Sequence, residues 1–230
     1  RNLRFYVDHT HEPGYMGVKN LLRTGQFFGL QYIYQTLTNS DGADPIDYPA
    51  IMANPAEFEL VATDAATGKP VYFTKDDMKQ DDYRAIMASC ALPVMCRPIS
   101  FKDQTYFDGG LSDSVPIMRA FAKGCDRVVV ILSKPRSFVK QPEGFRHIYR
   151  HALRKYPQTI AALDNRHLMY RQNIADVKKQ ESAGKALVFA PSKELKMSTY
   201  ARDEKLEQEL YDLGISDFDA RLNELHTFLS

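Results

Sequence analysis

The stretch Thr105-Tyr106-Phe107-Asp108-Gly109-Gly110 decides the fold and the candidate site, because a short apolar run is followed by an acid and two glycines. An acid at the end of a strand is held rigidly, and glycines let a ligand approach the backbone closely. This arrangement favours Asp108 as a catalytic carboxylate on an active-site turn formed by Gly109 and Gly110. The plainer alternative is an aspartate that only shapes a turn, since Asp-Gly pairs are common in turns.

Further short apolar runs predict strands around this stretch. Phe58–Ala62 and Pro70–Phe73 flank a glycine-containing turn, which is typical of a hairpin or of two neighbouring strands. Ile99–Phe101 and Gln104–Phe107 predict two more short strands. The run Arg127–Leu132 is rich in valine without interruption, as in a central parallel strand covered on both faces. We therefore expect an α/β fold with a mostly parallel sheet.

Helical patterns surround these strands and dominate the second half of the chain. Residues 1–40 predict short helices and loops, and residues 136–230 predict a mainly helical extension with one strand, after an α/β core over 1–135. Ser216 is a plausible cap between two tail helices. The expected helices are Asp82–Ser89, Val115–Lys123, Gly144–Tyr156 and Pro157–Ala183, and the expected last strand is Lys185–Ala190.

The composition excludes several classes of function. Thirty basic side chains face 29 acidic ones, so no global field would recruit nucleic acid. Cys90, Cys96 and Cys125 are an odd number without metal-ligand spacing, which favours a reducing compartment such as the cytoplasm. The longest clear apolar run, Val128–Leu132, is far too short to cross a membrane. We expect no metal ion and no cofactor.

An ordered set of motifs resembles the bacterial type of patatin-like phospholipase. Ala88-Ser89-Cys90-Ala91-Leu92-Pro93 is similar to the Ala-Ser-x-Ala-x-Pro pattern of that family, and Asp108-Gly109-Gly110 follows after two short strands. Ser89, Pro93 and Pro116 thus serve as supporting motif residues. The resemblance covers Phe58–Leu132, and Asn20–Phe28 is similar to the segment that follows the nucleophile helix in that family.

The resemblance implies a three-layer α/β domain that hydrolyses lipid acyl esters with a Ser–Asp dyad, in which Asp108 is the general base. The family carries its serine on a Gly-x-Ser-x-Gly turn, which is absent from these 230 residues, as is a glycine-rich oxyanion loop. We therefore expect the nucleophile and the first strands to lie upstream of Arg1, so that this chain alone is inactive. Ser114 stands where the family usually has asparagine.

Two other functions remain open at this point. One is a non-catalytic lipid-binding or interaction module that keeps the fold, and the other is an esterase for small soluble substrates. Within the chain, Ser89 lacks the flanking glycines of a nucleophile and is expected to cap or pack against the Asp108 turn. Cys90 is expected to be a small buried apolar residue.

Several helical side chains allow both a functional and a structural interpretation. His147 and His151 are spaced to share a metal, but a solvated helix face is favoured. His167 is expected to be a core histidine with its hydrogen bonds satisfied. The aromatic residues over 27–34 suit an acyl pocket or plain core packing. Beside aromatic residues lies a basic row that comprises Arg146, Arg150 and Arg154. This row could contact an anionic membrane surface, although a solvated helix face is again favoured.

Overall fold

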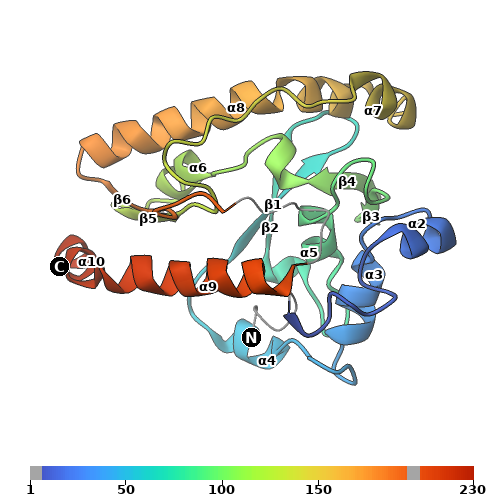
Figure 1. Cartoon of the computed structure of the whole chain (residues 1–230), viewed down its shortest axis with the longest axis horizontal. Coiled ribbons are helices and arrows are strands. Elements are labelled where there is room, and N and C mark those ends of the chain that lie inside the picture. Colours follow the sequence, from blue (N-terminus) through green and yellow to red (C-terminus); the bar gives the residue numbers. More distant parts are fainter. Residues whose placement is uncertain (1–6, 196–202) are drawn as a thin grey trace. The chain divides into compact units, whose positions relative to one another are not determined.

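The computed structural model describes residues 7–195 and 203–230, which form two compact units (Figure 1). Unit 2 comprises Glu12–Ser114 and Gln141–Met169, and unit 1 comprises the described residues of the remaining segments. The long helix α8 (Pro157–Ser182) contributes residues to both units. The division at residue 135 that the sequence indicates stays a prediction.

Unit 2 contains a four-stranded sheet in the order β2-β1-β4-β3, and every pairing in it is antiparallel. The expectation of a mostly parallel main sheet is therefore wrong. The physical reason lies in the connections, because strands joined by a tight turn must run antiparallel, and β1–β2 and β3–β4 are both hairpins. The strands are β1 (Glu59–Asp64), β2 (Pro70–Thr74), β3 (Ile99–Phe101) and β4 (Gln104–Asp108).

The two hairpin turns are specified by local chemistry. In the first, Asp64 Oδ1 accepts hydrogen bonds from the backbone N–H groups of Ala66 and Thr67, at 3.1 and 2.7 Å. In the second, Lys102 and Asp103 both adopt positive φ angles, 49° and 58°, as a two-residue turn between twisted strands requires. The predicted strands and the predicted first hairpin are confirmed.

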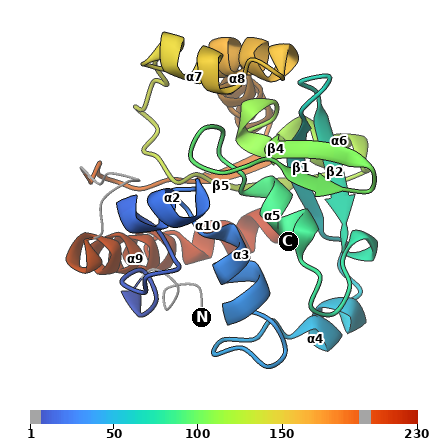
Figure 2. The ribbon, with the colours of Figure 1, turned by 90° about the vertical axis from the view of Figure 1, so that its right-hand side faces the viewer.

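The strand β4 is covered on both faces. Neighbouring side chains of a strand point to opposite faces, and here Tyr106 and Phe107 are 5% and 0% exposed. Tyr106 packs edge to face on Phe73 at 5.0 Å, in a cluster shared with the helix α5 (Arg84–Ser89). Phe107 belongs to a second cluster with residues of the helix α7 (Arg146–Ala152) and of α8. Figures 1 and 2 show these helices on opposite sides of the sheet, so the strand that carries Asp108 is clamped between two helical layers.

Short helices complete unit 2, and those predicted within residues 1–40 are confirmed for the part that the structure describes. The helix predicted over Gly144–Tyr156 is shorter at both ends. It begins only after Phe145, whose left-handed φ of 52° cannot continue a helix, and it ends at Ala152. The additional elements are α2 (Val18–Thr24), α3 (Leu30–Tyr32), the π-helical turn η1 (Ile33–Leu37), α4 (Tyr48–Ala53) and the 3₁₀ turn η2 (Lys75–Asp77).

Unit 1 holds a separate parallel pair of strands, β5 (Val128–Ile131) and β6 (Ala186–Phe189). Every residue of β6 is buried, whereas Val129 and Ile131 of β5 are 36% and 79% exposed. The expectation that this valine-rich run is a central strand covered on both faces is therefore wrong. Only its Val130 face packs into a core, with residues of α8 and β6.

The remaining helices of unit 1 are α6 (Ile117–Ala122), α9 (Glu204–Asp219) and α10 (Leu222–Leu229). The proposed cap Ser216 lies inside α9, so that prediction is wrong. Asp203 caps α9 instead, because its side chain accepts the otherwise unpaired N–H of Leu206 at 3.1 Å. Among the described residues, no helix combines the length and the apolar character needed to cross a bilayer.

Candidate active site

Asp108 ends β4 and begins the 3₁₀ turn η3 (Gly109–Leu111). Its Oδ1 accepts the Gly110 N–H at 2.7 Å, which fixes the orientation of the carboxylate. Its backbone is also held, since its N–H donates to the Ala91 carbonyl at 2.9 Å and its carbonyl accepts the Thr63 hydroxyl at 2.8 Å. The carboxylate is therefore positioned rigidly by neighbours on β1, on the loop after α5 and on its own turn.

Neither glycine of this turn has a positive φ, so backbone conformation does not explain the glycines. The explanation is the limited space around each Cα atom. A Cβ on Gly109 would lie 2.2 Å from the carbonyl oxygen of Val61 on the neighbouring strand β1. A Cβ on Gly110 would lie 2.9 Å from Asp108 Oδ1. A larger residue is thus excluded at Gly109 by the backbone of β1, whereas at Gly110 it would displace the Asp108 carboxylate from its position.

Burial raises the pKa of Asp108, and the Gly110 N–H and the positive charge of Arg166 offset only part of that rise. A carboxylate with a raised pKa accepts a proton more readily than an ordinary one. Within the described part of the chain, Oδ2 of Asp108 accepts no hydrogen bond. This oxygen can therefore receive a proton from a hydroxyl group that approaches it.

Arg166, on α8, is a site residue that the sequence did not indicate. Its Nε–H donates to the Gly110 carbonyl at 2.8 Å, and its Nη1 lies 3.1 Å from Glu143 Oε1. The Ser114 hydroxyl donates to the same Gly110 carbonyl at 2.9 Å. Ser114 therefore braces the turn although the resembling family usually has asparagine there. No local motif marks Arg166, because it reaches the turn only through folding.

The loop after α5 brings the Ala88–Pro93 motif next to Asp108. The contact to Asp108 is made by the backbone carbonyl of Ala91, whereas Ser89 is half-buried at the end of α5 and Pro93 pairs with Cys96 in an isolated β-bridge. The tight packing explains the alanines of the motif, since Ala88 and Ala91 are both 0% exposed. The roles of Ser89 and Pro93 stay predictions, as does that of Pro116, which lies at the N-cap of α6 in unit 1.

The cysteines near the site are thiols rather than thiolates. Burial raises the pKa of Cys90, although a contact of its Sγ with the Tyr34 hydroxyl at 3.6 Å lowers it, and the charge of Asp108 raises it further. Burial also raises the pKa of Cys96 to about 12. A thiol is a poor nucleophile compared with its thiolate. Cys96 is buried in the core, and Cys90, which was expected to be buried, is only partly buried and packs against the same core cluster.

The basic residues of α7 are engaged in a local ion-pair network. Arg146 and Arg150 bind Asp164 Oδ2 at 3.0 and 2.6 Å, and the Tyr149 hydroxyl donates to Oδ1 of the same carboxylate. Burial alone would raise the pKa of Asp164, but these partners outweigh it and hold that pKa well below its usual range. Among the described residues, Arg154 donates only to the backbone carbonyl of His151.

Two other predictions on α7 and α8 concern histidines. Across 7–195 and 203–230, no cluster of three or more histidine, cysteine or acidic side chains could hold a metal ion. Within the described ranges, the Nδ1 atom of His167 is buried without a hydrogen-bond partner, so the expectation of a satisfied core histidine is wrong.

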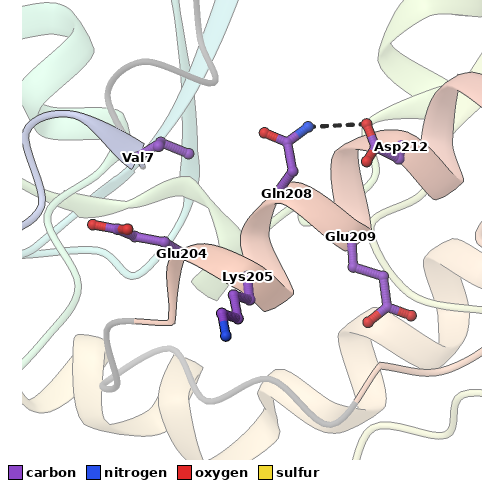
Figure 3. Close-up of a pocket in the computed structure, with 6 residues that line it drawn as sticks. All are labelled: Val7, Glu204, Lys205, Gln208, Glu209 and Asp212. Carbon is purple, nitrogen blue, oxygen red and sulfur yellow. Dashed lines mark hydrogen bonds between the residues drawn. The ribbon is translucent and has the colours of Figure 1, made fainter.

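A surface hollow lies in unit 1. It is lined by Val7, Glu204, Lys205, Gln208, Glu209 and Asp212, which are mostly charged or polar (Figure 3). Figure 3 shows Gln208 and Asp212 on one side of α9 and Lys205 and Glu209 on the other, so these groups do not converge on one point. Of the aromatic residues over 27–34, Phe28 and Tyr34 pack against the buried core of unit 2, which supports core packing.

With this geometry described, comparison with known proteins gives a consistent result. Residues 13–121 match the patatin-like phospholipase family. The predicted resemblance is thereby confirmed for a segment that contains both the Ala88–Pro93 motif and Asp108, and we refer to it as the patatin-like segment. Residues 156–230 match a domain of unknown function, DUF6363.

A curated relative is the uncharacterized protein YjjU of Escherichia coli (strain K12). It is 29% identical to this chain over 110 residues, which is 42% of this chain and 30% of that protein. The chain therefore spans less than a third of the length of this relative.

Proposed function

We propose that the full-length protein is a serine-dependent hydrolase of lipid acyl esters in which Asp108 is the general base. The observation that carries this proposal is the Asp108 carboxylate, which is rigidly held on a tight glycine turn and has a pKa raised by burial. The match of residues 13–121 to patatin-like phospholipases supports the same reaction class.

In the proposed mechanism, a serine hydroxyl approaches Oδ2 of Asp108 and attacks the ester carbonyl. The hydroxyl proton moves to Asp108 as the new bond between serine oxygen and carbonyl carbon forms, and the alcohol then leaves with that proton. In the second half, Asp108 takes a proton from a water molecule as the water oxygen bonds to the acyl carbon, and it returns that proton to the serine oxygen as the serine–acyl bond breaks and the carboxylic acid leaves. The Gly110 N–H stabilises the charged carboxylate between turnovers through its 2.7 Å hydrogen bond.

The nucleophile is the missing part of this mechanism. The 230 residues contain no Gly-x-Ser-x-Gly sequence, and Ser89 ends a helix without flanking glycines. We therefore place the serine, and the oxyanion donors that accompany it, on a segment upstream of Arg1. On this proposal the 230-residue chain by itself has no hydrolase activity.

Two alternatives compete with lipid hydrolysis. A non-catalytic lipid-binding or interaction module would keep the turn but need no serine. A carboxylesterase for small esters would use the same dyad without a lipid preference. The match of residues 13–121 to patatin-like phospholipases favours a lipid substrate over a small soluble one.

A fluorophosphonate probe and an isosteric variant test the proposal together. The full-length protein should be labelled on a serine upstream of Arg1, and Asp108→Asn should lower kcat on an ester by about two to four orders of magnitude. Asp103→Asn is the matched control, because the same change is made on an exposed turn five residues away. Absence of labelling would support a binding module, and labelling of Ser89 would contradict the assignment of the nucleophile.

The remaining proposals concern partners and location. We propose a lipid or other acyl ester as substrate, no nucleic-acid partner, and a cytoplasmic protein that contacts an anionic membrane surface from outside the bilayer. The helix α7 is a weak candidate for that contact, because Arg146 and Arg150 already bind Asp164.

A further inference from the structure

In the helix α2 the usual pattern of burial is reversed for Asn20 and for the apolar residues. Its apolar residues Val18, Leu21 and Leu22 are 63%, 40% and 82% exposed, whereas Asn20 is 2% exposed. A helix at the surface of a water-soluble protein normally buries its apolar stripe and exposes its polar residues. The exposed apolar side of α2 therefore has no explanation in the folding of unit 2.

The reversed orientation is fixed by specific hydrogen bonds. The buried amide of Asn20 donates to the Gln26 carbonyl at 3.0 Å, and the Thr24 hydroxyl donates to the Asn20 carbonyl at 2.8 Å. Gly25 ends the helix in a left-handed conformation, with φ of 73°. These contacts hold Asn20 on the inward side of α2, which leaves Val18, Leu21 and Leu22 on the exposed side.

The charged residues of α2 itself are both basic. Residues 13–40 contain no Asp or Glu, and their charged residues Lys19 and Arg23 lie on α2 itself and are exposed. The exposed Arg97 packs against the end of α2, since a Cβ on Gly25 would lie 2.9 Å from its Nη2. In Figure 1 α2 lies at the outer margin of unit 2, and Figure 2, turned to that side, shows it facing the reader.

We propose that α2 is the docking surface through which this protein contacts an anionic lipid bilayer. Val18, Leu21 and Leu22 enter the boundary between headgroups and acyl chains, and Lys19, Arg23 and Arg97 contact lipid phosphates. Apolar burial combined with basic attraction is the chemistry that binds interfacial helices to such surfaces. This inference rests on the proposed lipid substrate, and it places the contact on the same unit that carries Asp108.

The test measures binding of the full-length protein to vesicles of ether-linked phosphatidylglycerol and phosphatidylcholine, which an ester hydrolase cannot degrade. Val18→Ser with Leu22→Ser should weaken co-sedimentation by at least about tenfold, and so should Lys19→Gln with Arg23→Gln at low salt. High salt should weaken binding of the wild-type protein, because the attraction is screened over about 10 Å at 0.1 M. Circular dichroism melting curves verify that each variant is folded.

Two control variants match these changes elsewhere on unit 2. Leu168→Ser removes a leucine of α8 that is 53% exposed, and Arg154→Gln removes an exposed arginine of α7. Both should bind vesicles like the wild type. Equal losses in control and α2 variants, or a wild-type protein that ignores anionic vesicles at low salt, would overturn the proposal.

The remaining outcomes separate this proposal from its alternatives. A dimer that becomes monomeric on Leu22→Ser, together with absent vesicle binding, would make α2 a contact between two copies and would overturn lipid docking. A wild-type protein that binds vesicles through α2 but hydrolyses no ester contradicts only the proposed function. One that hydrolyses a soluble ester but ignores vesicles contradicts only the α2 proposal.

Discussion

Arg166 and Gly110 lie 56 residues apart in sequence, yet the Arg166 Nε–H donates to the Gly110 carbonyl at 2.8 Å. The N–H of the same Gly110 donates to the Asp108 carboxylate at 2.7 Å. One glycine thus connects an arginine of α8 to the proposed base. Arg166 acts on Asp108 in two ways, because it orients the turn and its charge lowers the pKa of the carboxyl group.

Replacing Arg166 should shift the pH profile of the reaction. Arg166→Gln removes the charge that lowers the Asp108 pKa, so that pKa should rise and the acidic limb of kcat/KM should move to higher pH. We expect kcat to fall about tenfold, and Arg166→Lys to restore the pH profile more fully than the rate, since lysine keeps the charge but not the planar donor. Arg154→Gln should change neither. An unaltered acidic limb in Arg166→Gln would exclude this positioning role.

Removing the buried carboxylate should stabilise the fold at neutral pH. The pKa of Asp108 is higher in the folded state than in the unfolded state. The titration of Asp108 therefore adds to the free energy of unfolding below the unfolded pKa of about 3.9, and this stabilisation is lost as the pH rises through the folded-state pKa. Asp108→Asn should therefore melt above the wild type at pH 7.5, and the difference should vanish near pH 4. Calorimetry at several pH values measures this, with Asp103→Asn as the control. A difference independent of pH would contradict the burial argument.

The close approach of β1 to the turn predicts a large effect of one methyl group. In Gly109→Ala the new Cβ would lie 2.2 Å from the Val61 carbonyl, which must then shift. We expect a loss of about 1–3 kcal/mol in the free energy of unfolding, measured by urea denaturation. Gly144→Ala, which adds a methyl group where no atom lies within 4 Å, should change it by less than about 0.5 kcal/mol. Similar losses in both variants would show that space at Gly109 is not limiting.

The Asp164 network should stabilise the protein with the opposite pH dependence. The pKa of Asp164 is lower in the folded state than in the unfolded state. Asp164 therefore adds to the free energy of unfolding above the unfolded pKa of about 3.9, and this stabilisation is lost as the pH falls through the folded-state pKa. Asp164→Asn should lower the free energy of unfolding by about 1 kcal/mol at pH 7, and less as the solution is acidified below pH 4. Tyr149→Phe should show a smaller effect. An Asp164→Asn variant as stable as the wild type at pH 7 would assign the network no role in stability.

Much of the local structure was predictable because it depends on neighbouring residues. The strands around Asp108 follow from short apolar runs, the first hairpin from Asp64 and Gly68, and the helix α5 from an apolar segment that stops before Pro93. Asp108-Gly109-Gly110 was recognisable because tight backbone approach tolerates few residue types. The sequence by itself therefore determined the elements, the acid and its turn.

The tertiary structure alone decided how these parts meet. A valine-rich run indicates a buried strand but does not specify its neighbours, so the exposed side of β5 was not foreseeable from residues 127–132. The pairing of β1 with β4, which joins the two hairpins into one antiparallel sheet, was likewise decided only by folding. Arg166, Thr63 and Ala91 reach Asp108 from distant segments, and no local pattern records such contacts. The reversed face of α2 likewise depends on which carbonyls Asn20 meets after folding. The physical reason is that sequence periodicity reports burial, whereas partners are set by the packing of the whole unit.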